Sequence, residues 1–258
     1  QYIENCIFEH NYVHDCHGEG MYLGPNAYDL RVPLRNITVR YNWCQGMGRE
    51  GMQCKSWFSG TNAVYGNTVI GNGLSGDTAD CTGISMLSSV ADVHDNWVQD
   101  SGHNGINFYT DRFPPATDYP SFTCNVYNNV VINAGVLGTG NDEGIVANAS
   151  STAGMTDLIV HIYSNTVVDC NGNGIQIATN AGAGWVRNNI SLGNGTAISI
   201  NGASSQTGNL TGTAPATYLN ADYTLKAAYA VTGGSYAPYT SEASVTGTSA
   251  INQTARTS

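Results

Sequence analysis

The sequence carries little charge. Asp, Glu, Lys and Arg make up 11% of its 258 residues, where about a quarter is usual for a soluble protein. Only nine residues are Lys or Arg, and the formal net charge is −10. A nucleic-acid partner is therefore disfavoured, because neutralising phosphates requires Lys and Arg. An acidic polysaccharide stays compatible only where the few cations cluster or where a divalent ion bridges substrate and protein.

Long hydrophobic runs are also missing. No stretch approaches the roughly 18 apolar residues that span a bilayer, so the sequence predicts no membrane span. No signal peptide is visible, since Gln1 opens directly into what looks like a structural repeat. We therefore expect that further coils or other segments precede Gln1 in the natural protein.

Glycine, asparagine and apolar residues are abundant. The 31 glycines and many asparagines predict a chain rich in turns. The hydrophobic fraction of 41% is high enough for a packed core and argues against disorder. No amphipathic helix of useful length is apparent, which favours an all-β chain.

A repeat organises the sequence. In each of seven segments an apolar residue stands three positions before an Asn and another stands two after it, and a later Gly opens a short apolar strand. The asparagines assigned to this register, at spacings of 23 to 36 residues, are Asn11, Asn42, Asn67, Asn96, Asn129, Asn165 and Asn188. Alternation with period two marks the segments as strands. Such recurrence is expected of a solenoid, in which each coil stacks its apolar residues on the next.

The recurring Asn has a physical explanation. Asn tolerates left-handed backbone angles at a tight corner. Stacked at one coil spacing of about 4.8 Å, its amide can donate to one neighbouring coil and accept from the other. The alternative is that Asn simply favours loops, which seven asparagines in register make improbable.

Segments such as VRYNWC…EGMQC (from Val39) and VYNNVV…EGIVA (from Val126) resemble the pectate-lyase-like superfamily of right-handed parallel β-helices. The resemblance covers roughly residues 3–200 and matches no specific enzyme family. It implies an all-β fold, a single-stranded right-handed parallel β-helix of about seven coils, over residues 1–205. Residues 206–258 are expected to form a closing segment and a Ser/Thr/Ala-rich tail.

Six of the seven cysteines occupy positions that other coils fill with core residues, so buried small hydrophobes are the preferred interpretation. Cys81 alone lies in an insertion, next to the strand expected to stack on Cys54. A Cys54–Cys81 disulfide is therefore a hypothesis. No pair of cysteines has the spacing of a zinc finger.

The strand that follows the repeat Gly offers the best candidate site. Its outward positions carry amides and aromatic rings suited to sugars, and insertions of up to a dozen residues beside it predict the walls of a cleft. The candidate substrate-binding residues on or near this row are Tyr22, Gln53, Trp57, Asn107, His103 and Gln176. His103 can also be read as a simple polar surface group.

Carboxylates precede the repeat Gly in three coils, at Glu19, Glu50 and Glu143. Two interpretations stay open. Carboxylate and amide oxygens can bind calcium, or Glu merely caps backbone donors at a turn, which is the interpretation we favour. Calcium is the only cofactor that the sequence suggests.

The superfamily also contains polysaccharide lyases, and the segment QCKSWFSG resembles the Lys-Ser segment of alginate and chondroitin lyases. The resemblance implies that Lys55 removes the proton α to a uronate carboxylate, that Arg112 neutralises the carboxylate, and that Tyr109 or His103 serves as acid. The alternative for Lys55 is an exposed, solvated lysine.

Other family signatures are absent, including those of polygalacturonases, pectate lyases and mannuronan epimerases. The sequence thus predicts a secreted or cell-surface carbohydrate-active protein, and among such proteins it favours a lyase of an acidic polysaccharide. The alternative is a non-catalytic glycan-binding or structural adhesin that forms one piece of a larger extracellular protein, and a phage-type spike is a weaker one. Fold alone does not decide between them.

Overall fold

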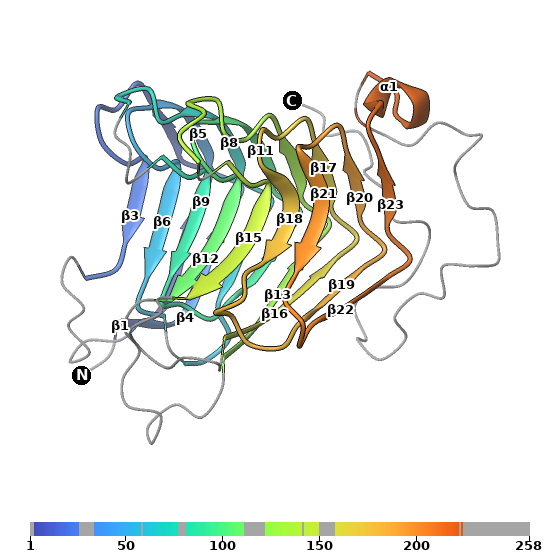
Figure 1. The fold of residues 1–258 in the computed structure, drawn as a ribbon. Helices are drawn as coiled ribbons and strands as arrows, with labels where there is room; N and C mark the ends of the chain where they lie inside the picture. The colour runs from blue at the N-terminus through green and yellow to red at the C-terminus, as the bar shows by residue number, and fades with distance from the viewer. Residues whose placement is uncertain are drawn as a thin grey trace.

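The computed structural model describes residues 3–25, 34–57, 59–76, 81–110, 122–140, 142–149, 158–221 and 223. Its strands pair in parallel and form three sheets that run side by side along the molecule (Figure 1). We name them sheets A, B and C in the order in which each coil of the chain visits them.

Sheet A contains β1 (Ile3–Glu9), β4 (Leu34–Arg40), β7 (Ala63–Tyr65), β10 (Asp92–His94), β13 (Phe122–Tyr127), β16 (Leu158–Tyr163), β19 (Trp185–Arg187) and β22 (Ser205–Thr207). Sheet B contains β2 (Tyr12–His14), β5 (Trp43–Met47), β8 (Thr68–Asn72), β11 (Trp97–Ser101), β14 (Val130–Ile132), β17 (Thr166–Val168), β20 (Ile190–Leu192) and β23 (Leu210–Gly212). Sheet C contains β3 (Met21–Leu23), β6 (Met52–Lys55), β9 (Ile84–Leu87), β12 (Ile106–Thr110), β15 (Ile145–Ala149), β18 (Asn173–Ile177) and β21 (Thr196–Ile200).

The strand numbers rise by three along each sheet, so every coil adds one strand to A, one to B and one to C. Seven coils are complete, and an eighth contributes β22 and β23 before the short helix α1 (Pro215–Tyr218). The predicted right-handed parallel β-helix is confirmed, with the expected number of full coils. Its sheets continue to Gly212, beyond the predicted boundary at residue 205.

The core is built from vertical columns of inward side chains. One column in sheet A runs through Val39, Val64, Val93 and Val126, which pair in register and are fully buried. The residue after the repeat Gly begins the equivalent column of sheet C, as predicted. Because alternate residues point inward, a short strand supplies one or two core residues per coil.

The repeat glycines are required by close approach across the core. A Cβ on Gly51 would collide with Cγ1 of Val69, and one on Gly105 would collide with Cγ1 of Val131. Sheets B and C therefore meet so closely at this turn that the backbone of one touches the valines of the other.

The asparagine ladder stands at the corner between sheets A and B. Side-chain amides donate from coil to coil at 2.8–3.1 Å, for example from Nδ2 of Asn67 to Oδ1 of Asn96 at 3.0 Å. Each inner amide also donates to a backbone carbonyl of the preceding coil, as Nδ2 of Asn96 does to Val64 at 2.9 Å. Asn67 and Asn96 are fully buried, so these bonds satisfy polar groups that water cannot reach.

Two details of the predicted ladder are wrong. Asn189, not Asn188, belongs to it, since Asn165 donates to Oδ1 of Asn189 at 3.0 Å, and Asn189 in turn donates to Asn209. Asn209 is an eighth member that the prediction missed. With Asn189 in the ladder, Val186 again stands three residues before it, as in the other coils.

The left-handed backbone conformation is also adopted by a different residue than predicted. It is adopted by the residue before each ladder Asn, such as Tyr41 (φ 55°), Asp95 (φ 55°), Ser164 (φ 56°) and Asn188 (φ 53°). The ladder Asn is thus selected for its amide, while the residue before it turns the chain.

Replacing one inner ladder residue should be strongly destabilising. Asn96→Ala removes two accepted and two donated side-chain hydrogen bonds in a buried position, and orphaned partners cost about 1–3 kcal/mol each. We expect the free energy of unfolding in urea to fall by about 3 kcal/mol or more.

The matched control is Asn11→Ala at the exposed start of the ladder, where water can replace the lost partner. Its expected loss is below about 1 kcal/mol. Equal losses at the two positions would show that the ladder's buried bonds do not stabilise the fold.

All seven cysteines are free, so the predicted Cys54–Cys81 bridge is wrong. Cys54 stacks between Leu23 and Met86 in the core of sheet C, whereas Cys81 lies at the turn between sheets B and C, where its carbonyl accepts from Nδ2 of Asn72 at 2.6 Å. Five of the cysteines are buried, in agreement with the interpretation as small hydrophobes.

Burial should make most of the thiols inert. Desolvation raises the pKa of the Cys44, Cys124 and Cys170 thiols to about 12 and that of Cys54 further, which lowers the fraction of reactive thiolate. In iodoacetamide labelling followed by mass spectrometry, we expect only the partly exposed Cys6 and Cys16 to react rapidly in the native protein. All seven should react in denaturant, and fewer than seven would reveal a disulfide.

The last described residues of the chain pack against the outer face of sheet B. Leu219, directly after α1, is buried against the outward Val168, Ile190 and Leu192. This end of sheet B is therefore covered by the chain itself. No helix among the described residues is long and apolar enough to cross a membrane.

Candidate functional site

Sheet C, whose strands β3 to β21 are labelled in Figure 1, has a row of outward positions in register, one per coil. The pairing registers place in this vertical column Tyr22, Gln53, Ser85, Asn107, Val146 and Gln176. Tyr22, Asn107 and Gln176 are partly exposed, whereas Gln53, Ser85 and Val146 are buried. The column is therefore polar except at Val146, and half of its side chains reach solvent.

A second outward column contains two of the predicted catalytic residues. Lys55 pairs with Leu87, and Leu87 pairs with Tyr109. Lys55 and Tyr109 therefore lie on the same face of the same sheet, separated by one intervening coil. Lys55 is only 8% exposed, so it is not the solvated surface lysine of the alternative interpretation. Arg112, the third member, lies outside the described residues.

Gln53 is held by a carboxylate. Its Nε2 donates to Oε1 of Glu50 at 2.7 Å. The pair links the polar column of sheet C to the row of residues that precede the repeat glycines. A ligand that uses the Gln53 amide would have to compete with Glu50.

Two predicted substrate-binding residues lie away from this face. Trp57 is fully buried in the core, where its Nε1 donates to the carbonyl of Leu23 at 3.0 Å. The strand ends at Lys55, so the alternation that predicted an outward Trp57 no longer applies there. His103 is 2% exposed at the turn between β11 and β12, with Nε2 2.7 Å from Oγ1 of Thr139.

The insertions flank sheet C at both ends of its strands. Those after Leu23 and Thr110 lead from sheet C to sheet A, whereas those after Asn72 and Ile132 lead from sheet B into sheet C. The expectation that all of them rise from one edge is therefore wrong. Parts of these insertions lie outside the described residues.

The three carboxylates before the repeat glycines do not converge. Backbone hydrogen bonds between coils order this row as Glu50, Thr82, Asn104, Glu143, which places Glu50 and Glu143 three coils apart. Within the part of the chain that the structure describes, no three His, Cys, Asp or Glu side chains group closely enough to hold a metal ion.

The three carboxylates instead contact neighbouring side chains singly. Glu19 pairs with Arg49 at 3.3 Å, and Oε1 of Glu143 accepts from Nδ2 of Asn173 at 3.4 Å. These contacts are with side chains, so the capping of backbone donors, which the sequence favoured, stays a prediction.

Glu143 supplies a test by pH. Burial raises the pKa of its carboxyl above the ordinary value because the charged form is desolvated, and the hydrogen bond from Asn173 only partly offsets this. A raised pKa in the folded state means that protonation favours folding, so this penalty grows as the pH rises from the unfolded value of about 4.3 through the folded pKa. We expect Glu143→Gln to remove that pH dependence and to be more stable than wild type at neutral pH in urea unfolding.

Glu19→Gln, which removes a carboxylate paired with Arg49, is the control and should not gain stability at neutral pH. Were Glu143 to bind calcium, the substitution would instead abolish a calcium-dependent rise in Tm, which would contradict the turn interpretation.

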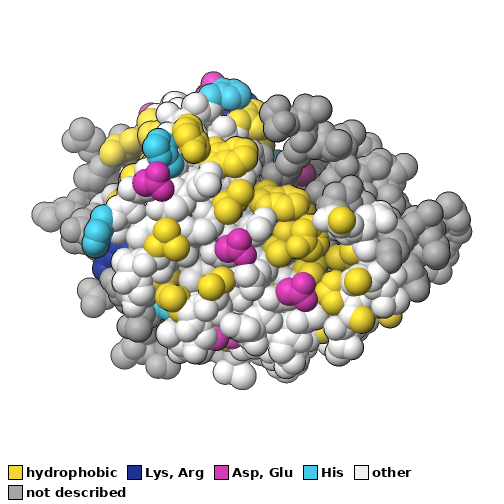
Figure 2. All heavy atoms as spheres, turned by 90° about the horizontal axis from the view of Figure 1, so that it is seen from above, with side chains coloured by type: hydrophobic (Ala, Val, Ile, Leu, Met, Phe, Trp, Pro, Cys, Tyr) yellow, Lys and Arg dark blue, Asp and Glu magenta, His cyan; other side chains and the backbone are white. Residues whose placement is uncertain are grey.

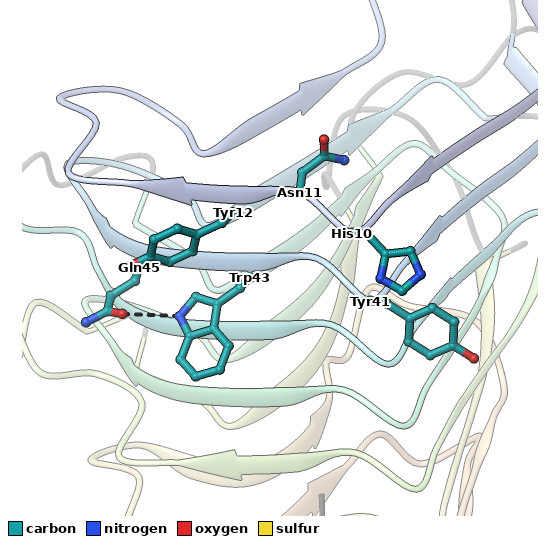
Figure 3. A pocket seen from close by; sticks show the side chains of 6 residues that line it. All are labelled: His10, Asn11, Tyr12, Tyr41, Trp43 and Gln45. Carbon is teal, nitrogen blue, oxygen red and sulfur yellow. Dashed lines mark hydrogen bonds between the residues drawn. The ribbon is translucent and has the colours of Figure 1, made fainter. Parts of the chain in front are cut away.

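Sequence reasoning missed an aromatic cluster at the corner between sheets A and B (Figure 3). A shallow hollow of about 450 Å³ there is lined by His10, Asn11, Tyr12, Tyr41, Trp43 and Gln45. The available signal was the motif Trp-x-Gln, which occurs at Trp43–Gln45 and again at Trp97–Gln99, in both cases at outward positions of the strand after the ladder Asn.

Comparison with known proteins gives only distant likenesses. The enzymatically active domain of tailspike protein 2 of bacteriophage CBA120 superposes with a TM-score of 0.48 at 14% identity, over 78% of this chain and 31% of the tailspike chain. The A-module of a mannuronan C-5 epimerase from Azotobacter vinelandii gives 0.44 at 14% identity, over 80% of this chain and 58% of the module.

The chain thus spans under a third of the tailspike chain that it matches. No protein-family model matches the sequence, and no curated protein does. These likenesses are too distant to assign an activity.

Proposed function

We propose that the outer face of sheet C binds a polysaccharide, outside the cell or at its surface. The observation that carries this proposal is the vertical column in which Tyr22, Asn107 and Gln176 stand partly exposed, three coils and then two coils apart. A linear polymer with repeated hydroxyl groups is the ligand that such a repeated row fits, because amides pair with hydroxyls and Tyr rings cover apolar sugar faces.

The reaction we propose is β-elimination on an acidic polysaccharide. Lys55 removes the proton from the carbon next to the uronate carboxylate, and the electron pair of that C–H bond forms a carbon–carbon double bond. The glycosidic C–O bond at the β carbon breaks, and Tyr109 protonates the departing oxygen. The scheme gives Arg112 the role of neutralising the carboxylate, which makes the proton more acidic.

The position of Lys55 supports this choice of base. Lys55 is the single cation contributed by the described strands of sheet C, and it shares an outward column with Tyr109. The two residues lie two coil spacings apart, roughly 10 Å, with Leu87 between them in the column.

A second candidate is a non-catalytic glycan-binding or structural segment of a larger extracellular protein. It is favoured by the burial of Lys55, which is only 8% exposed, and by the engagement of Gln53 with Glu50. In this form the same face binds a polymer without cleaving it.

The test is turnover of alginate, polygalacturonate and chondroitin sulfate, followed by the ultraviolet absorbance of the unsaturated product. We expect product from at least one polymer, and a fall in kcat of about 100-fold or more in Lys55→Ala. Arg35→Ala, which removes a cation from sheet A, should keep full activity.

Full activity in Lys55→Ala would show that the base lies elsewhere. Binding of one of the three polymers without any product would support the non-catalytic candidate, and neither binding nor product with all three would contradict both.

A further inference from the structure

The hollow at the corner between sheets A and B gathers the most exposed aromatic side chains of the described β-helix. All six residues that line it are exposed, and the exposed fractions of Tyr12, Tyr41 and Trp43 are 62%, 48% and 41%. Large exposed aromatic side chains gathered in one place commonly mark a binding surface.

One ring of the hollow, Trp43, has no other described ring stacked on it. Tyr12 and Trp43 meet edge to face, with an interplanar angle of 80° and centroids 6.5 Å apart. Tyr12 itself stacks on His14 at 4.7 Å, and Tyr41 stacks on His10 at 5.4 Å. Elsewhere on the outer surface, rings of successive coils also stack, as Tyr65, His94 and Tyr127 do at 4.8 and 4.6 Å, so Trp43 is the ring best placed to receive a flat ligand.

At the opposite end of sheet B the outer face is covered rather than exposed. There the outward Val168, Ile190 and Leu192 are buried beneath Leu219. Exposure of aromatic rings at Tyr12 and Trp43 is therefore not a general property of the outer face of sheet B.

A polar group stands beside the indole in a position suited to hydroxyl groups. Nε1 of Trp43 donates to Oε1 of Gln45 at 3.2 Å (Figure 3), which orients the amide and leaves its Nε2 to donate to a ligand. The same arrangement recurs two coils further on, where Nε1 of Trp97 donates to Oε1 of Gln99 at 3.2 Å. That second unit is less accessible, because Trp97 is only partly exposed and Tyr223 lies against it edge to face at 6.0 Å.

A flat ring beside an oriented amide is the arrangement that recognises a pyranose. The apolar face of the sugar packs on the ring, and its hydroxyls bond to the amide. Aromatic side chains with a few placed polar groups are typical of such sites.

Charge indicates which glycan fits. Strands β2, β5, β8 and β11 contribute no Lys or Arg, and the carboxylates of Asp15 and Asp100 adjoin them. Arg40 lies 5.6 Å from the Tyr41 ring, but its charge is paired with Glu9 at 2.6 Å. In the view from above, acidic and His side chains are scattered over the surface and Lys or Arg appear only near its margin (Figure 2).

We propose that this hollow is a binding site for a neutral glycan chain, with Trp43 as the ring platform and Gln45 as the hydroxyl-binding amide. The site is distinct from the outer face of sheet C, where Lys55 suits an acidic polymer. It does not depend on the reaction proposed there.

The test is native gel electrophoresis through gels that contain mixed-linkage β-glucan, arabinoxylan or galactomannan, with polygalacturonate as the acidic comparison. The protein, at a formal net charge of −10, migrates toward the anode, and binding retards it. We expect at least one neutral polysaccharide to retard the wild type. Trp43→Ala should weaken that binding about tenfold or more, which corresponds to about 1.4 kcal/mol.

Three variants serve as controls. Val136→Ala removes another exposed apolar side chain, 52% exposed, that follows β14, three coils from β5, and should bind as wild type does. Lys55→Ala should also keep neutral-glycan binding, because it alters sheet C alone. Gln45→Ala removes the amide without removing a ring, and should weaken binding severalfold even if a Trp43 variant folds poorly by circular dichroism.

The proposal is overturned if no neutral polysaccharide retards the protein, or if folded Trp43→Ala and Gln45→Ala are retarded as strongly as wild type. Retardation by polygalacturonate alone, lost in Lys55→Ala, would likewise overturn it while supporting the function proposed for sheet C.

Discussion

Hydrogen bonds between side-chain amides of successive coils hold the corner on which the rest of this solenoid depends. The chain passes from sheet A to sheet B through two residues in every coil, as between Arg40 and Trp43 or between Tyr127 and Val130. One of the two takes the left-handed conformation and the other is the ladder Asn. Because each buried amide needs its partners at one coil spacing, a residue cannot be inserted there without leaving them unpaired. The other two corners vary in length between coils, from the short link after Leu87 to the long ones after Leu23 and Thr110.

A fixed corner turns each face of the molecule into columns of equivalent positions, and each face uses its columns differently. Sheet A stacks rings in parallel and so covers their faces. Sheet C presents amides and hydroxyls near its one described cation, Lys55. Sheet B leaves Tyr12 and Trp43 open at one end and covers its apolar residues with Leu219 at the other. The same backbone therefore presents two separate surfaces of different composition.

The fold could be predicted from the sequence because its determinants repeat, and a chance match at one coil is corrected by the others. The predicted ladder residue was wrong at Asn188 because Asn188 and Asn189 are adjacent, and only their distance from Val186 distinguishes them. Alternation placed Lys55 and Tyr109 at outward positions because both lie within strands, and their catalytic roles stay predictions. Trp57 and His103 lie in turns, where tertiary packing rather than periodicity directs the side chain, and both are buried. The Cys54–Cys81 disulfide hypothesis was wrong because the two cysteines, although on adjacent coils, lie at different places on them. Cys54 is in sheet C and Cys81 is at the turn before that sheet.

The central claim is that adjacent ladder amides stabilise the fold through one another, and a double-mutant cycle between Asn96 and Asn129 tests it most directly. Free energies of unfolding would be measured for wild type, Asn96→Ala, Asn129→Ala and the double variant. If the amides act as a ladder, the two losses are not additive, and the coupling energy is about 1 kcal/mol or more, since their side chains bond at 2.9 Å in a buried site. Strictly additive losses would show that each Asn serves only its own turn, and would contradict the account.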